Sequence, residues 1–410
     1  MLNRFALLFS CFLPQLLIAQ TLGFSLSDGK SRVQIPIEIQ NNLAIVPVIL
    51  NNQVPLRFIL DTGVRTTILT EKTYSDILHL VYSRKYSIAG PGGEKVIDAY
   101  VTNNVTLDLP GVHGEGHAML VLEKDYLELR NYLGTEVHGI LGYEVFSRFI
   151  VEIDYIKKVL ILQLPEQFKA PRNFQELPIA VQDTKPYVYT EIEINDSTRL
   201  KAKLLMDTGA SHGLILEPDS DSKITVPEKH INSIIGRGLG GVITGKIGRI
   251  KSLEIGKYKI THVLANFPDA NSYNDTLKTS RHVFRNGALG GEILSRFDVI
   301  YNFPGEKVYF KKNSAFKKEF YFNLSGLTIK ARGARLRKYE ITDVRKNSTA
   351  EKADIKVGDV LLYVNGTSVD EFNLNQVNGF LNSKPGRRIS FEIERNGVRI
   401  KRVFKLENQI

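Results

Sequence analysis

The tripeptide Asp-Thr-Gly occurs twice in this 410-residue chain, as Asp61-Thr62-Gly63 and as Asp207-Thr208-Gly209. Each copy directly follows a run of apolar residues, Phe58 to Leu60 before the first and Leu204 to Met206 before the second. A single short motif would be weak evidence. Two copies at the end of similar strand-like runs predict a duplicated unit that presents two equivalent carboxylates.

A second landmark supports the duplication. The segment Ile140-Leu141-Gly142-Tyr143-Glu144-Val145-Phe146-Ser147-Arg148-Phe149 recurs as Ala288-Leu289-Gly290-Gly291-Glu292-Ile293-Leu294-Ser295-Arg296-Phe297. The Asp-Thr-Gly copies are 146 positions apart and these later segments are 148 positions apart. Two halves of nearly equal length therefore carry the same landmarks in the same order.

Each half follows the same mainly β pattern, in which alternating strands flank Asn-rich turns and a glycine-rich segment comes after Asp-Thr-Gly. The expected strands of the first half are Ala44 to Leu50, Val54 to Leu60, Val105 to Leu109, Val151 to Tyr155 and Val159 to Leu162. Those of the second half are Val188 to Ile194, Leu200 to Met206, Ser252 to Gly256, Val299 to Phe303 and Val308 to Phe310. A short helical turn is expected after each Leu-Gly landmark, and the expected linkers are Pro165 to Pro178 and Lys311 to Lys318.

The remaining segment, Phe320 to Gln409, has a different pattern. We expect a strand over Tyr339 to Val344, a short capped helix over Ser348 to Ala353 and a helix near Leu374 to Leu381. Strands Arg388 to Arg395 and Val398 to Leu406 flank Asn396-Gly397, a strong hairpin signal. This order of elements resembles a PDZ domain of the bacterial exported-protease type.

Composition limits the remaining possibilities. Met1 to Gln20 has the layout of a secretory signal peptide, with Arg4 before an apolar run, and an uncleaved anchor is the alternative. The only cysteine, Cys11, lies in that segment, so the mature chain would have neither a disulfide nor a thiol nucleophile. No other stretch is long enough to span a membrane. The net charge is +10, but no basic motif with interleaved aromatic residues accompanies it, so nucleic acid is not an expected partner.

Two carboxylates held within hydrogen-bond distance share one proton at intermediate pH, because like charges oppose each other's ionisation. The ionised carboxylate can take a proton from a water molecule while the protonated one donates to a carbonyl oxygen. This chemistry hydrolyses an amide without a metal or a cofactor. The threonine after each aspartate can brace the opposite loop, and the glycine permits a tight turn.

The duplicated Asp-Thr-Gly with a downstream apolar-apolar-Gly resembles the aspartic proteases of the retropepsin-like branch, here with both lobes in one chain. The whole chain resembles bacterial exported aspartyl protease family proteins with a PDZ domain. The resemblance implies that Asp61 and Asp207 are the catalytic dyad, supported by Thr62, Gly63, Thr208 and Gly209. It places Ile140-Leu141-Gly142 and Ala288-Leu289-Gly290 under the catalytic loops. The implied flap residues are Gly90, Gly92, Gly93, Gly238, Gly240 and Gly241, and the implied PDZ peptide-binding residues are Gly326, Leu327, Thr328 and Ile329.

The chain departs from the pepsin pattern at Val64 and Ala210, where a hydroxyl residue is usual, so an extremely acidic optimum is not expected. Arg65 is unusual beside a catalytic loop and is expected to face solvent.

Three further signals do not change this interpretation. The pattern Gly236-Arg237-Gly238-Leu239-Gly240-Gly241 formally fits a dinucleotide motif, but Val242 to Ile255 alternates like a hairpin instead of a helix. His113 and His117 lack zinc-site spacing and are expected in a surface turn. His212 is expected to be an ordinary histidine.

The sequence therefore predicts a mainly β protein with a signal peptide at 1–20, protease lobes at 30–165 and 178–312, and a PDZ domain at 320–409. Its expected function is endopeptidase activity on a peptide or protein substrate, without a cofactor or metal, in the periplasm or outside the cell. The PDZ domain is expected to bind the C-terminus of a protein, or alternatively to stabilise the lobes by packing. The rival interpretation is a non-catalytic envelope scaffold that binds peptides.

Overall fold

The protein is mainly β, and a computed structural model describes residues 22–88, 90–93, 96–270 and 283–410. The expected signal peptide at 1–20 lies outside these ranges. The first-half strands are β1 (Gly23–Leu26), β2 (Arg32–Pro36), β3 (Glu38–Gln40), β4 (Leu43–Leu50), β5 (Val54–Leu60), β6 (Thr67–Leu69), β7 (Tyr82–Ile88), β8 (Ile97–Val105), β9 (Leu107–Asp108), β10 (Val112–Glu115), β11 (His117–Leu122), β12 (Gly139–Leu141), β13 (Ile150–Asp154) and β14 (Val159–Gln163).

The second half and the C-terminal domain continue the series. Their strands are β15 (Gln175–Gln182), β16 (Lys185–Glu193), β17 (Arg199–Met206), β18 (Leu214–Leu216), β19 (His230–Gly238), β20 (Gly241–Ile255), β21 (Tyr258–Pro268), β22 (Gly287–Leu289), β23 (Phe297–Asn302), β24 (Lys307–Lys312), β25 (Leu327–Arg332), β26 (Lys338–Val344), β27 (Val360–Val364), β28 (Thr367–Ser368), β29 (Arg388–Arg395) and β30 (Val398–Lys405). The short helices are α1 (Lys72–Ile77), α2 (Leu129–Leu133), α3 (Tyr143–Arg148), α4 (Gly291–Leu294), α5 (Thr349–Lys352) and α6 (Leu374–Leu381).

The two lobes are built alike. In the first, the strand order is β3-β4-β5-β12-β6-β11-β8-β7. In the second, the strands that correspond to β4 through β7 of this order are β16-β17-β22-β18-β21-β20-β19. In both lobes a short strand from the second landmark runs parallel to the strand that precedes Asp-Thr-Gly, β12 beside β5 and β22 beside β17. The pairing of β20 with β16 closes the second lobe on itself.

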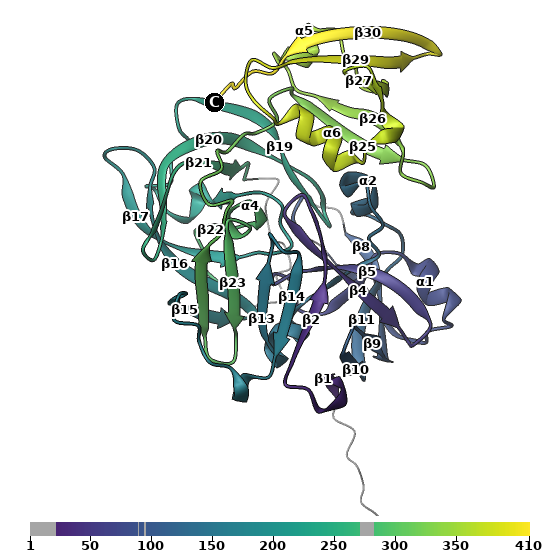
Figure 1. The fold of residues 1–410 in the computed structure, drawn as a ribbon, viewed down its shortest axis with the longest axis vertical. Coiled ribbons are helices and arrows are strands. Elements are labelled where there is room, and N and C mark those ends of the chain that lie inside the picture. Colours follow the sequence, from purple (N-terminus) through teal and green to yellow (C-terminus); the bar gives the residue numbers. More distant parts are fainter. Residues whose placement is uncertain (1–21, 89, 94–95, 271–282) are drawn as a thin grey trace, which may run out of the picture.

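A shared sheet joins the lobes. Its six strands follow the order β15-β24-β23-β13-β14-β2, so three come from each half, and they meet where β13 pairs with β23 (Figure 1). Buried aromatic side chains pack against this sheet, with Phe146 of α3 and Tyr301 of β23 edge to face at a 5.5 Å centroid separation. The lobes therefore share one hydrophobic core, and the position of each Asp-Thr-Gly loop depends on both halves.

Most expected elements are present at or near their predicted bounds, including both strands before the Asp-Thr-Gly loops and the α3 and α4 turns. Asn51 and Asn52 both have positive φ, as a tight turn between β4 and β5 requires. Three of these expectations were wrong. The linker Pro165 to Pro178 ends inside strand β15, because Gln175 to Pro178 pair with β24. The linker Lys311 to Lys318 begins inside strand β24, because Lys311 and Lys312 pair with β23. Val242 to Ile255 is not a hairpin by itself but part of the single 15-residue strand β20, which pairs with β19 and β21.

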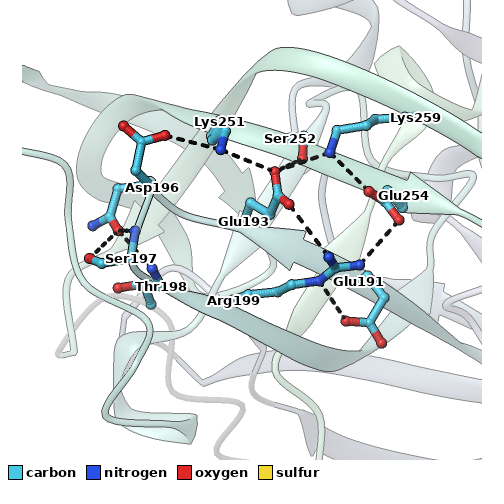
Figure 2. Close-up of polar contacts among 11 residues, drawn as sticks. Glu191, Glu193, Asp196, Ser197, Thr198, Arg199, Lys251, Ser252, Glu254 and Lys259 are labelled. Carbon is cyan, nitrogen blue, oxygen red and sulfur yellow. Dashed lines mark hydrogen bonds and ion pairs between the residues drawn. The ribbon is translucent and has the colours of Figure 1, made fainter.

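A cluster of cross-strand ion pairs links four strands of the second lobe (Figure 2). Arg199 on β17 lies 3.4 Å from Glu191 and 3.4 Å from Glu254, while Lys259 lies 3.1 Å from Glu193 and 3.0 Å from Glu254. Single exposed pairs contribute little, but several that share partners fix the register of β16, β17, β20 and β21 more firmly.

The C-terminal domain forms a separate sheet, β25-β26-β27-β29-β30, with its own hydrophobic core. The Ser348 side chain accepts a hydrogen bond from Glu351 N and caps α5, as predicted, and Asn396 and Gly397 adopt the positive φ of a hairpin turn. Figure 1 shows this domain above the lobes, with α2 of the first lobe directly below α6 and β25. Among the described residues, no helix is long and apolar enough to cross a membrane.

Candidate active site

The two Asp-Thr-Gly loops begin where β5 and β17 end, and each is held by the strand beside it. Asp61 N donates to Leu141 O and Asp207 N donates to Leu289 O, both over 2.8 Å. The second landmark of each half therefore lies against the Asp-Thr-Gly loop of the same half. The register of β12 with β5, and of β22 with β17, fixes where each aspartate leaves its sheet.

The threonines connect the two loops. Thr62 N donates to Thr208 Oγ1 and Thr208 N donates to Thr62 Oγ1, each over 3.0 Å. Thr208 Oγ1 also donates to Leu60 O, and Thr62 Oγ1 donates to Met206 O. Both threonine side chains are fully buried. Each loop is therefore braced by the other, so their separation is set by direct bonds between backbone and hydroxyl groups.

This brace brings the two carboxyl groups into hydrogen-bond contact. Gly63 N donates to Asp61 Oδ1 over 2.6 Å, and Gly209 N donates to Asp207 Oδ1 over 3.0 Å. Each glycine also faces the aspartate of the other lobe. A Cβ on Gly209 would overlap the Asp61 carboxyl group, and one on Gly63 would lie 3.5 Å from Asp207 Oδ1. Close approach of the backbone thus requires glycine at position 209, whereas the space at Gly63 is only tight.

The glycine that follows leucine in each landmark packs under the same loops. Tyr143 N donates to Val64 O over 2.9 Å, and Gly291 N donates to Ala210 O over 2.6 Å. A Cβ on Gly142 would overlap Val64 O, and one on Gly290 would overlap His212 O.

Burial and mutual repulsion raise the pKa of Asp61, while the backbone hydrogen bond from Gly63 and the charge of Lys185 oppose the rise. Burial also raises the pKa of Asp207, but the nearby charge of Arg285, the Gly209 amide and the hydrogen bond from Asp61 counteract it. The environment therefore favours a proton on Asp61 and a negative charge on Asp207. The two groups titrate as a pair, since each carboxyl senses the other.

Arg285 and Lys185 are site residues that the sequence analysis missed. The side chain of Arg285 is only 10% exposed and donates to Glu217 Oε1 over 2.7 Å. At the repeat spacing of 148 positions, Arg285 corresponds to Val137, so a buried cation in one half replaces an apolar residue in the other. That break in the repeat was a signal available in the sequence.

Arg65 points to solvent, as expected, with a side chain 72% exposed and 3.8 Å from Asp183 of the second lobe. Burial lowers the pKa of His212 to about 4, so its ring is neutral near pH 7.

The expectation of a surface turn at His113 and His117 was wrong, because His113 lies on strand β10 and His117 on strand β11. His113 is exposed, and its Nδ1 lies 2.6 Å from Asp108. His117 is buried, with Nδ1 3.2 Å from Glu144 and its ring 4.2 Å from that of Phe24. No group of three or more His, Cys, Asp or Glu residues that could hold a metal occurs within the described ranges.

The glycine-rich segments of the two lobes meet. Gly240 N donates to Pro91 O over 3.0 Å, and an added Cβ would overlap backbone atoms of the opposite segment at Gly92, Gly238 and Gly240. Leu239, at the tip of the β19–β20 hairpin, packs against a cluster of the first lobe that includes Ile68 and Leu127. We call residues 90–93 and 238–241 the flap tips. They adopt a closed arrangement in which only glycine fits at several positions.

The expected PDZ peptide-binding residues lie at the start of β25. Thr328 and Ile329 are on this edge strand. The amides of Gly326 and Leu327 both donate to Asn323 Oδ1, over 2.8 Å and 3.1 Å. The loop expected to hold a terminal carboxylate is therefore bonded to an amide oxygen of the chain itself.

Two protein-family models match segments of the chain that contain the elements described above. An aspartyl protease family model matches residues 46–145 and again residues 190–293, and a PDZ domain model matches residues 340–395. A search of curated proteins found no match. Each protease match contains one Asp-Thr-Gly loop and its landmark segment. The chain therefore carries two aspartyl protease domains followed by a PDZ domain.

Proposed function

We propose that the protein is an aspartic endopeptidase in which Asp61 and Asp207 activate a water molecule. The observation that carries this proposal is the reciprocal bonding of Thr62 and Thr208, which holds two buried carboxyl groups against each other. Two desolvated carboxyl groups in contact oppose each other's ionisation, which is unfavourable near neutral pH. A turn with a purely structural role would gain nothing from this arrangement.

In the proposed reaction, the ionised Asp207 accepts a proton from a water molecule held between the carboxyls. The water oxygen attacks the carbonyl carbon of the substrate, while the protonated Asp61 donates to the carbonyl oxygen. The charge of Arg285 and the Gly209 amide stabilise the carboxylate form of Asp207. When the tetrahedral intermediate collapses, Asp207 donates the proton that it took from water to the leaving amine, and the C–N bond breaks. Asp61 recovers its proton from the hydroxyl group that it had protonated, so the dyad returns to its starting state.

The substrate would be an extended peptide between the lobes and beneath the flap tips. The bond from Gly240 N to Pro91 O joins the two flap tips, so a peptide that passes beneath them would have to separate them first. We propose that the PDZ domain binds a peptide or protein partner, consistent with the PDZ family match.

The test is cleavage of a diverse peptide pool by the purified protein, with and without a transition-state-mimicking aspartic protease inhibitor. We expect cleavage that the inhibitor blocks and that a chelator leaves unchanged, because His113 and His117 are bonded to carboxylates away from the dyad. Tight binding of pool peptides without any cleavage would favour the rival function, a non-catalytic peptide-binding scaffold.

We further propose that the protein is exported, on the basis of the leader-like composition of residues 1–20. The N-terminal sequence of the mature protein, determined from a fractionated bacterial host, checks this. A new N-terminus near Ala19 or Gln20 is expected, and an intact Met1 in the cytoplasmic fraction would contradict export.

A further inference from the structure

A segment of the first lobe covers the open edge of the PDZ sheet. Among the strands that the structure describes, β25 pairs with β26 alone, so no strand is paired along its other edge. Asn131 of α2 reaches that edge, where its Nδ2 donates to Ala331 O over 2.7 Å. Gly134, just after α2, lies against Leu374 at the start of α6, so closely that an added Cβ would overlap the leucine side chain.

The covered surface is the one that a PDZ domain uses for its ligands. An extended peptide adds beside the edge strand, in the groove between that strand and a helix. Here β25 and α6 border this groove, and residues 128–134 lie against both (Figure 1). The other face of the segment is anchored, because Leu129 and Leu133 pack against the core of the first lobe.

The contact is centred on Glu128. Its carboxylate lies 2.6 Å from Lys330 Nζ and 3.3 Å from Arg332 Nη1, both on β25, and 3.7 Å from Arg237 Nη2 on β19. The Lys330 side chain is only 8% exposed and also lies over the Tyr132 ring, at 4.3 Å from its centroid. An ammonium group that is buried this far needs a carboxylate partner.

Glu128 also connects the PDZ domain to a flap tip. Arg237 immediately precedes residues 238–241, and its guanidinium lies 5.5 Å from the centroid of the Tyr132 ring. Leu239 packs against the cluster that contains Leu127. Any movement of residues 127–132 away from β25 would therefore disturb the contacts that hold this flap tip closed.

We propose that residues 128–134 are an internal ligand of the PDZ domain, that an extended peptide with an acidic side chain displaces them, and that displacement releases the flap tip at residues 238–241. The acidic side chain takes the place of Glu128 between Lys330 and Arg332. An internal acidic residue fits better than a free chain end, because Asn323 Oδ1 already accepts from the Gly326 and Leu327 amides. Only the release step rests on the proposed peptidase function.

Binding is tested on the full chain carrying Asp207→Asn, so that no probe is cleaved. The probes are labelled eight-residue peptides rich in Val and Thr, with one Glu at successive positions, each matched by its Gln version. We expect at least one Glu peptide to bind about tenfold more tightly than its Gln match, because it alone pairs with Lys330. Failure of all the peptides to bind, or equal binding of each pair, would overturn the proposal.

Competition is tested with Glu128→Gln and, in case that variant unfolds, with Asn131→Ala. Both weaken the internal ligand, so the dissociation constant of the Glu peptide should fall by about threefold or more. Glu340→Gln is the matched control, since Glu340 lies 2.9 Å from Arg332 but belongs to the PDZ domain itself, and its effect should be below about twofold. An unchanged constant in both test variants contradicts an internal ligand.

Release is followed by amide hydrogen exchange and then by turnover. The Glu peptide should speed exchange at residues 129–134 and 236–241, and it should raise turnover of a separate short substrate in the active protein. Binding without faster exchange at 129–134 would overturn the displacement. Faster exchange there with unchanged exchange at 236–241 would overturn the coupling. A protein that binds and exchanges as expected but cleaves nothing would refute the peptidase function alone.

Discussion

Thr62 and Thr208 exchange hydrogen bonds across the boundary between the lobes, each backbone N–H donating to the other's hydroxyl oxygen over 3.0 Å. Each hydroxyl then donates its own proton to the carbonyl of the residue before the opposite aspartate, Met206 O or Leu60 O. The pair therefore leaves no donor unsatisfied at the base of the site, and it fixes the spacing of Asp61 and Asp207.

Replacing one of these hydroxyl groups should affect both stability and activity. Thr208→Val keeps the shape but leaves Thr62 N without its buried acceptor, so we expect the free energy of unfolding to fall by about 1–3 kcal/mol. Peptidase turnover should fall by about tenfold or more, because the carboxyls lose their fixed separation. Thr208→Ser keeps the hydroxyl and should retain most of both. Denaturant unfolding and kcat/KM measure these effects, and equal behaviour of the Val and Ser variants would contradict the brace.

Removing either carboxylate should abolish turnover and yet stabilise the fold near pH 7. Asp61→Asn and Asp207→Asn each destroy the shared-proton pair, and their effects on kcat should not add in the double variant. The pKa of Asp61 in the folded protein is raised above its ordinary value of 3.8. The stability that the protonated carboxyl contributes is therefore fully present below pH 3.8, and it is lost as the pH rises through the folded pKa. An amide cannot ionise, so the variant escapes this loss.

The measurement is the unfolding free energy of Asp61→Asn and of the parent at pH 4 and at pH 8. The difference in favour of the variant should grow with pH. Asp219→Asn, at an exposed position, serves as the control and should show no such trend. A variant that is less stable than the parent at pH 8 would mean that the carboxyl is not desolvated in the folded protein.

The β architecture was predictable because its signals are local. Alternating strands, Asn-rich turns and the two landmarks each occupy about ten residues or fewer, and the duplication showed which of them belong together. For the same reason, the bounds of β5, α6 and β29 agree with the sequence prediction to the residue.

Contacts between distant segments were not predictable. Glu128 meets Lys330 and Arg237 only because α2, β25 and β19 converge, and no periodicity in the sequence records this. The strand over Gln175 to Pro178 was missed because prolines at each end of the linker suggested a loop, whereas pairing with β24 stabilises an extended chain there. Helix propensity likewise says nothing about a five-residue helix such as α2, whose stability comes from packing.

Arg285 should determine the pH at which kcat/KM falls on the acidic side of its pH profile. Its positive charge lowers the pKa of Asp207, which must be ionised to accept a proton from water. Arg285→Met removes that charge, so the pKa of Asp207 rises and the acidic limb of kcat/KM should move to higher pH. The exposed Arg199→Met should leave the profile unchanged apart from a small effect on stability. A shift to lower pH in Arg285→Met would contradict the assignment of Asp207 as the base.

The flap tips should tolerate no side chain at Gly240. A Cβ there would overlap Gly90 O, so Gly240→Ala is expected to hold the tips apart. Water would then reach the dyad more readily, and turnover should fall by about tenfold. Gly379→Ala is the control, because no atom lies within 4 Å of the added carbon and the residue is in helix α6. It should leave turnover intact and raise stability by up to about 1 kcal/mol through helix propensity.

The attachment of the PDZ domain to the second lobe determines how its removal should be tested. Arg249 Nη2 donates to Phe320 O over 2.8 Å and Arg249 Nε to Ile410 O over 3.2 Å, so one side chain binds the chain on both sides of the domain. Phe320 and Ile410 are buried in the core of the lobes. Truncation after Lys318 removes both, and each buried side chain contributes about 1.5–3 kcal/mol.

Truncation after Lys318 should therefore lower the thermal stability of the lobes, whether or not the domain recruits substrate. A second truncation after Glu407 keeps the PDZ fold but removes Ile410, and it separates the two effects. If the domain recruits protein substrates, short-peptide turnover at a temperature where all forms remain folded should be similar in both truncations. Cleavage of a folded protein substrate should then fall only in the shorter form. An equal fall in both forms for both substrates would show that the domain acts by packing alone.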